Sequence, residues 1–340
     1  MRPAPSPRPS PELRLLHLQP SDGEYQLHGL EALPGLLRAG DLLVVNDAAT
    51  LPASLRGRTR EGSTVELRLL AREEDGRWTG VLFGAGDWRT RTEDRPPPPA
   101  VAAGETLYFG ALEARVLALL PPSPRLVRVA FSLEGAALWS ALYRTGRPVQ
   151  YAHLTRPLAL WDVQTAYAAR PWAAELPSAG LPLTWELLLA LRRRGVELAS
   201  VTHAAGLSST GDPALDAALP RPERFSVPAA TVEAIARTKA RGGRVVAVGT
   251  TVVRALEGRA LQGGGRLEPG EGETDVLLGP GFRRQVVDGL LTGVHDPGTS
   301  HFLLLQAFAP LALLREAHTW AEGAGLLGHE FGDVCLLLDG

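Results

Sequence analysis

The segment GGRVVAVGTTVVRALE, residues 242–257, places residues that could bind an anion at a turn between a strand and a helix. Residues 245–248 form a short apolar run typical of a buried strand, and the glycine that follows allows a sharp turn into a helix. The first N–H groups of that helix have no intrahelical acceptor. Together with the hydroxyls of Thr250 and Thr251, and with Arg254 one turn further on, they could hold a phosphate or a carboxylate.

The same spacing has a structural alternative. Thr250, Arg254 and Glu257 share one helical stripe at i, i+4 and i+7. The threonine could therefore cap the helix while Arg254 and Glu257 form a surface ion pair. Spacing alone leaves both interpretations open.

A second segment, residues 274–297, brings acidic side chains and a histidine to the ends of short apolar runs. Asp275 and Asp288 bracket these runs, and His295 closes the last of them just before Pro297. Carboxylates and imidazoles at strand ends are suited to general acid–base chemistry. Each could equally be a turn-forming aspartate or a structural histidine.

The elements that must position these residues alternate between strand and helix after about residue 150. Thr184 is suited to cap a helix that Gly195 ends, and Pro228 is suited to open another. Further elements are expected as strands at 40–47, 196–202, 245–248 and 334–338, helices at 252–259, 300–308 and 311–322, and a hairpin over 274–292. This alternation predicts an α/β fold with a parallel-rich sheet covered by helices.

The pattern of apolar and polar residues changes between residues 55 and 133. Short alternating runs, separated by Gly, Pro and charged residues, occur at 64–70, 78–83, 106–109, 114–119 and 126–131. Such spacing without helical periodicity predicts a small antiparallel β-barrel-like domain. We therefore expect this domain over 55–133, inserted into an α/β catalytic domain that comprises 13–54 and 134–340.

The ends and the composition of the chain limit its class. Prolines at every second position from 3 to 11 predict that residues 1–12 form a disordered tail. The most apolar run, 302–314, is too short to cross a bilayer, and the first residues do not resemble a secretion signal. We therefore expect a cytoplasmic protein that does not contact a membrane.

Cysteine and charge exclude further classes. Cys335 is the only cysteine, which excludes an intrachain disulfide and a thiolate-rich metal site. A formal net charge of −2 argues against general affinity for nucleic acid, while it permits a local basic face. The sequence carries no signal of the oligomeric state.

Several segments, in order along the chain, resemble the S-adenosylmethionine:tRNA ribosyltransferase-isomerase family of queuosine biosynthesis. Residues 242–257 are similar almost residue for residue to the strand–glycine–Thr–Thr–helix signature of that family. Residues 37–57, LRAGDLLVVNDAATLPASLRG, resemble its N-terminal signature. Further similar segments are VQTAYA at 163–168, PSAGLPLT at 177–184, Thr274-Asp275, Pro280-Gly281, Val287-Asp288-Gly289, His295 and Phe331-Gly332-Asp333. The ordered set, from about 30 to 338, covers nearly the whole chain.

The resemblance implies an α/β domain interrupted by a β-barrel-like domain, and a specific reaction. Enzymes of this family use S-adenosylmethionine as a ribosyl donor. A base removes a proton next to the sulfonium, and the ribosyl unit passes to the aminomethyl group of a 7-deazaguanine in the tRNA anticodon loop. Adenine and methionine leave, and an epoxycyclopentanediol forms.

The resemblance also implies roles for individual residues. Thr250, Thr251 and Arg254 would anchor the donor. Asp275, Asp288 and His295 would transfer protons or orient the donor. The residues implied to bind the substrates or to line their pocket are Asn46, Asp47, Gln164, Tyr167 and Asp333.

The chain departs from the family pattern where polar side chains would be expected. Ala48 and Ala49 replace a Thr-Arg pair, and Gly298 replaces a lysine. Near the end of the chain the family's arginine is absent, and Glu330 stands beside Phe331. Losing several such contacts, each of about 1.5–3 kcal/mol, could abolish the family's original activity.

Three histidines, His203, His301 and His329, have no counterpart in the family pattern. With His295 they could form an acid–base set or hold a metal ion. Their spacing does not resemble a compact metal motif, so no metal site is expected.

Three hypotheses of function follow. The first is ribosyl transfer from S-adenosylmethionine to tRNA. The second is a divergent paralogue acting on another acceptor, which the missing polar residues favour. The third is a catalytically silent protein that binds RNA or a nucleoside.

Overall fold

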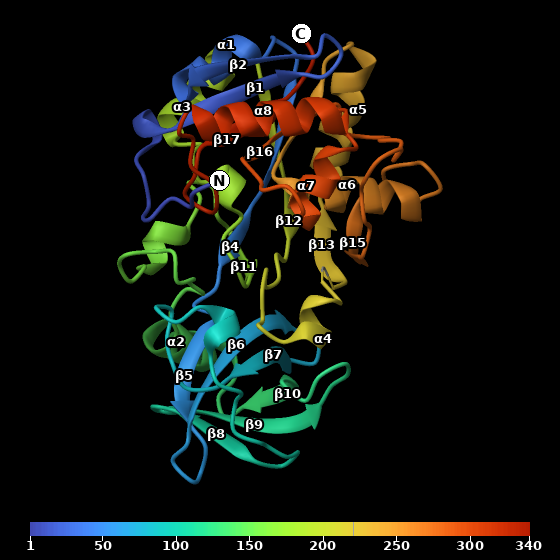
Figure 1. Ribbon diagram of the computed structural model, residues 1–340. Helices are drawn as coiled ribbons and strands as arrows, with labels where there is room; N and C mark the ends of the chain where they lie inside the picture. The colour runs from blue at the N-terminus through green and yellow to red at the C-terminus, as the bar shows by residue number, and fades with distance from the viewer. Residues whose placement is uncertain (220) are drawn as a thin grey trace.

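The structure, a computed structural model, describes residues 1–219 and 221–340. Within these residues a large mixed sheet with helices on both faces forms one domain, and a closed antiparallel barrel forms a second. Figure 1 shows the two domains stacked, with the barrel below the sheet. The fold class expected from the sequence is confirmed.

The large sheet has nine strands in the order β15-β13-β12-β3-β14-β16-β17-β1-β2. The four central strands β12, β3, β14 and β16 are mutually parallel, and antiparallel strands flank them on both sides. The strands are β1 Arg14–Gln19, β2 Glu24–Gly29, β3 Leu42–Asn46, β12 Glu197–His203, β13 Glu223–Val227, β14 Val245–Val248, β15 Gly270–Thr274, β16 Gly289–Gly293 and β17 Val334–Leu337. Parallel strands place their carboxyl ends along one edge, where α/β proteins bind their ligands.

Helices cover both faces of this sheet because alternate strand residues point to opposite sides. Leu42 and Val44 of β3 belong to a core that also includes residues of α5 to α8. Leu43 and Val45 belong to the opposite core with α3. The helices are α1 Leu33–Leu36, α2 Gly135–Thr145, α3 Trp185–Arg193, α4 Pro213–Asp216, α5 Ala229–Ala240, α6 Thr250–Gln262, α7 Ser300–Leu305 and α8 Leu311–Gly323. Short 3-10 helices are η1 Ser10–Glu12, η2 Leu30–Ala32, η3 Thr92–Asp94, η4 Leu160–Val163 and η5 Ser178–Gly180.

The boundaries predicted from the sequence for two helices, α3 and α5, are confirmed. Thr184 caps α3, since its hydroxyl accepts the N–H of Leu187 at 3.4 Å, and the helix ends just before Gly195. Pro228 is the N-cap of α5. In each case the residue with the special backbone or hydrogen-bonding property sets the boundary.

The barrel closes in the order β10-β7-β6-β5-β8-β9, with antiparallel pairing throughout. Its strands are β5 Ser54–Arg58, β6 Thr64–Arg72, β7 Trp78–Phe83, β8 Thr106–Phe109, β9 Leu112–Leu119 and β10 Leu126–Phe131. Closure leaves no unpaired sheet edge. The apolar core of the barrel continues into α2 through Leu138, Ala141 and Leu142, so the packed unit extends beyond residue 133.

Two neighbouring chain segments connect the domains. On the way out, β4 (Ala48–Thr50) pairs in parallel with β11 (Arg170–Ala173). Further on, Ser54 and Arg147 exchange two backbone hydrogen bonds of 2.9 Å, which hold the outgoing and returning segments together. The two ends of the inserted unit therefore lie side by side.

The hairpin expected over 274–292 is wrong. β15 pairs with β13 at the sheet edge, whereas β16 lies between β14 and β17. The buried carboxylate of Glu257 accepts the backbone N–H groups of Gln285, Val286 and Val287, at 2.8–3.0 Å. These bonds fix the connecting segment against α6 and replace the ladder that a hairpin would have made.

The expectation of a disordered tail over 1–12 is also wrong. Pro3 forms a parallel bridge with Gly328, and Ala4 is fully buried. Arg8 donates to the carboxylate of Asp333 at 3.0 Å, and Asp333 is itself fully buried. A buried carboxylate needs such partners, and this requirement holds the proline-rich segment in place.

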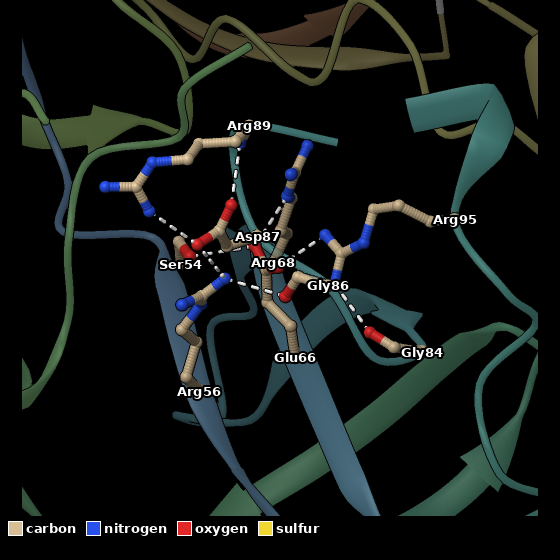
Figure 2. Close-up of polar contacts among 9 residues, drawn as sticks. All are labelled: Ser54, Arg56, Glu66, Arg68, Gly84, Gly86, Asp87, Arg89 and Arg95. Carbon is tan, nitrogen blue, oxygen red and sulfur yellow. Dashed lines mark hydrogen bonds and ion pairs between the residues drawn. The ribbon is translucent and has the colours of Figure 1, made fainter. Parts of the chain in front are cut away.

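A buried charge network links two strands and a loop of the barrel (Figure 2). Glu66 Oε1 accepts from Ser54 Oγ at 2.8 Å and from Arg68 Nε at 2.7 Å, and its Oε2 accepts from Arg95 Nη1 at 2.5 Å. Both guanidinium groups lie over the ring of Phe83, at 4.3 and 5.1 Å. Burial opposes the charged carboxylate, but the two arginines outweigh it and lower the pKa of Glu66 to about 2.

Among the described residues, no helix has the length and apolar character that crossing a membrane requires.

We predict that Glu66→Ala lowers the free energy of unfolding by about 3–5 kcal/mol, because it leaves two buried guanidinium groups without their partner. Urea denaturation of the two proteins measures this difference. Because the pKa of Glu66 falls from 4.5 to about 2 on folding, its contribution is present above about pH 4.5 and is lost as the pH falls towards 2. The matched control is Glu113→Ala on the exposed side of β9, which should change stability by less than about 0.5 kcal/mol. An equal effect of the two variants would contradict the prediction.

Candidate active site

A cleft of about 1610 Å³ lies between the large sheet and the barrel. One wall comes from β6 and β7 of the barrel, including Trp78 and Thr79. The opposite wall comes from the carboxyl ends of the parallel strands: Val248 ends β14, Gly293 ends β16, and Ala204 follows β12. The cleft is larger than a typical small-molecule pocket of about 300–1,000 Å³, so it has room for more than one small ligand.

The start of α6 lies on this wall as the sequence predicts. Gly249, Thr250 and Thr251 all line the cleft. Gly249 has φ 91° and ψ 152°, a backbone conformation that is essentially restricted to glycine. Asn46 Nδ2 donates to Thr251 Oγ1 at 3.3 Å and so orients this hydroxyl. The first amides of α6 have no intrahelical acceptor and can meet an anionic group here.

Arg254 does not make the expected surface pair with Glu257. Its guanidinium is only 8% exposed and forms an ion pair with Glu223, while its Nε donates to the carbonyl of Val276 at 3.2 Å. Glu257 is buried and caps backbone amides instead. Arg254 lines the cleft, but its charge is largely engaged by a neighbouring carboxylate.

His203 lies behind this ion pair. Its ring is fully buried, and Nε2 lies 3.5 Å from the Glu223 carboxylate. Burial lowers its pKa to about 4, so the ring is neutral at neutral pH. Neither ring nitrogen has a hydrogen-bond partner among the described residues.

His295 lies at the cleft wall with a second histidine against it. The rings of His295 and His301 stack with centroids 4.9 Å apart and an interplanar angle of 16°. His295 Nε2 lies 2.8 Å from Thr292 Oγ1, and the tautomer that donates this bond leaves Nδ1 with a lone pair. Removal from water lowers the pKa of His295 well below its ordinary range, so this imidazole is neutral at neutral pH.

The structure places Asp288 away from the cleft. Its Oδ2 accepts the N–H of Val245 at 2.8 Å, at the start of β14. The cleft lies at the other end of that strand. Asp275 is exposed and does not line the cleft either. Of the three predicted acid–base residues, the structure brings only His295 to the cleft.

Four of the five predicted substrate-binding side chains have structural partners behind the cleft wall. Asn46 holds the backbone of His203 through its amide, and Asp47 accepts from Ser200 and Thr202 at 3.0 and 2.6 Å. Gln164 exchanges two hydrogen bonds with the backbone of Thr50. Asp333 binds Arg8 and Arg14.

The fifth, Tyr167, packs in the core on the α3 side of the sheet, and its buried hydroxyl has no partner among the described residues. None of these five residues is among those that line the cleft.

Sequence reasoning missed a carboxylate in the cleft. Glu175 lines the cleft and accepts from Tyr151 and, at 2.5 Å, from Ser208 Oγ. Burial raises the pKa of this carboxyl group. The three residues lie far apart in the chain, so no spacing signal could have joined them.

Arginines surround a partly buried tryptophan at the rim of the cleft. Trp172 lines the cleft, and the guanidinium groups of Arg224 and Arg170 lie over its ring at 4.2 and 5.5 Å. Arg72 and Arg221 line the same cleft. Carboxylates that include Glu73, Glu74 and Glu271 line the cleft beside these arginines, so this rim carries charges of both signs.

The fold and this site define a two-domain α/β protein with a ligand cleft at the carboxyl ends of its parallel strands. The family model described as "Queuosine biosynthesis protein" matches residues 2–337. The chain belongs to this family.

Known relatives agree over most of their length. The S-adenosylmethionine:tRNA ribosyltransferase-isomerase of Anaeromyxobacter dehalogenans is 36% identical over 332 residues, which cover 96% of this chain and 92% of that protein. The protein of the same name from Beijerinckia indica is 34% identical, with 95% and 89% covered. The crystal structure of the S-adenosylmethionine tRNA ribosyltransferase from Thermotoga maritima matches with a TM-score of 0.53 and 27% identity, over 99% of this chain and 96% of that one.

We predict that Gly249→Ala destabilises the protein by about 1–3 kcal/mol, because alanine cannot adopt this backbone conformation without strain. The added Cβ would also lie 3.3 Å from that of Ala179. Urea denaturation checks this. The matched control is Gly323→Ala at the end of α8, where a Cβ meets nothing within 4 Å and a gain of up to about 1 kcal/mol is expected. Unchanged stability in Gly249→Ala would show that the turn is not constrained.

Proposed function

We propose that this protein is an S-adenosylmethionine:tRNA ribosyltransferase-isomerase that acts on 7-aminomethyl-7-deazaguanine in tRNA. One observation carries the proposal: the open amides at the start of α6 and the neutral imidazole of His295 line the same cleft wall. The relatives with this name share the fold and nearly the full length of the chain.

The carboxylate of the donor's methionine part would bind the first amides of α6 and the hydroxyls of Thr250 and Thr251. A helix start attracts negative charge through its unpaired N–H groups and its dipole. Because Arg254 is paired with Glu223, we assign it a positioning role: it holds the α6 wall against the segment that contains Val276.

His295 is the candidate base for the proton next to the sulfonium. A positively charged sulfur acidifies the adjacent C–H, and a neutral imidazole beside it can take that proton. The ribosyl carbon then bonds to the aminomethyl nitrogen of the acceptor, and the donor's bonds to adenine and methionine break. The product carries an epoxycyclopentanediol.

The acceptor would enter from the rim. Arg72 and Arg221 would supply charge for RNA phosphates, and the ring of Trp172 would offer a surface on which an unpaired base can stack. An unpaired base is available in a loop, so we propose the anticodon loop as the partner. Such a substrate places the protein in the cytoplasm.

The proposal is tested by incubating the protein with adenine-labelled S-adenosylmethionine and three RNA conditions: no tRNA, unmodified tRNA, and tRNA with the aminomethyl precursor base. Release of adenine only with the precursor tRNA supports the proposal. Release with another acceptor, or without RNA, would instead indicate a divergent paralogue. Tight donor binding without turnover would indicate a silent binding protein.

We predict that His295→Asn lowers the rate of adenine release by about 10²–10⁴-fold, as expected for loss of a general base. Donor affinity, measured by calorimetry, should change far less. Asp288→Asn is the comparison variant: loss of its charged bond to the β14 backbone should cost about 1–3 kcal/mol of stability and leave the rate nearly unchanged. A large loss of rate in Asp288→Asn, with His295→Asn still active, would reverse these assignments.

A further inference from the structure

Three side chains that the proposed reaction does not use gather at the edge of the cleft. His153 lies in the segment that returns from the barrel, and His329 and Glu330 lie in the turn before β17. One potential ligand atom from each lies within 4.8 Å of the others. Their separation in the chain hides this cluster from any motif, so the sequence predicts no metal site.

Two of these side chains form a close pair. His153 Nε2 and Glu330 Oε2 lie 3.0 Å apart, and both atoms are buried. Neither atom has another polar partner in the described part of the chain. An imidazole nitrogen and a carboxylate oxygen held this close together can share a cation, which is either a proton or a metal ion.

The third side chain, that of His329, lies against the ring of His153. The rings of His153 and His329 have centroids 4.9 Å apart and are tilted by 41°. His329 is the one non-glycine residue with a positive φ, 65°, among those the structure describes. Its carbonyl accepts the N–H of Gly332 at 3.0 Å. The N–H of neighbouring Gly328 donates to the carbonyl of Arg2, in the N-terminal segment, at 2.9 Å. A side chain fixed on a sparsely populated backbone conformation is typical of functional positions.

We propose that His153, His329 and Glu330 form a binding site for a divalent transition-metal ion such as Zn²⁺. Two imidazole nitrogens and one carboxylate oxygen are a donor set that suits zinc and other late first-row metals better than Mg²⁺ or Ca²⁺. Three protein ligands leave a coordination position open.

The open position faces the cleft. His329 and Glu330 both line it, and the imidazole of His329 is 43% exposed. An anionic oxygen of a bound ligand could therefore complete the coordination. None of the three ligands is a residue assigned to the proposed reaction, so the test of this site does not depend on that reaction.

The test uses the full-length protein after treatment with a chelator and dialysis. Isothermal titration with Zn²⁺ should give one site per chain, and Co²⁺ should give visible absorption bands of a four- or five-coordinate ion. Glu330→Gln and His329→Gly should each weaken Zn²⁺ binding by at least about 100-fold, as loss of one of three ligands requires. Glycine is chosen at 329 because it accepts the positive φ without strain.

Two controls make the outcome decisive. His28→Gln, on β2, removes a histidine outside the cluster and should bind Zn²⁺ like the unaltered protein. His301→Asn disrupts the other histidine pair of the cleft. The proposal is overturned if no Zn²⁺ binds below about 100 μM, a free energy near −5.5 kcal/mol. It is also overturned if His329→Gly, folded by circular dichroism, binds normally, or if only His301→Asn abolishes binding.

Discussion

The parallel alignment of β12, β3, β14 and β16 is the constraint on which the site depends. It brings the carboxyl ends of these strands to one edge, and the chain leaves that edge after β3 to build the barrel. The sheet edge and the barrel therefore form the two walls of the cleft. Its sheet wall is well packed, because β3, β14 and β16 each bury apolar side chains on both faces of the sheet.

Most of the elements could be predicted from the sequence, because local signals and packing agree. Strands β7, β8, β10 and β14 have the residues that alternation and apolar runs indicate. The errors occur where a distant partner decides. The backbone N–H groups of residues 285–287 donate to Glu257, which lies in another element. Arg8 is held by Asp333, which is more than 300 residues away in the sequence. No local pattern contains that information.

In the candidate site too, features that are contiguous in the chain were predictable, whereas contacts between distant residues were not. The α6 turn was predictable, since a strand, a glycine and a helix start are contiguous in the chain. The role expected of Asp288 was not, because a carboxylate beside a strand can lie at either end of the sheet. The ion pair of Arg254 with Glu223 also depends on the pairing of β13 beside β12, which joins residues distant in sequence. Residue types indicated the chemistry, whereas strand order decided which residues share a cleft.

The pairing of Ser54 with Arg147 brings together the chain segments that enter and leave the small domain. Their reciprocal hydrogen bonds place the two ends of the inserted unit about 5.5 Å apart, as in any antiparallel pair. A gap of that size can be closed by a tight turn, so the α/β domain does not need the barrel to keep its own chain path. The chain therefore enters and leaves the small domain through one narrow neck, whereas the apolar core of that domain also includes Leu207 and Leu215 of the α/β domain. Removal of the barrel would leave these two side chains without their apolar partners.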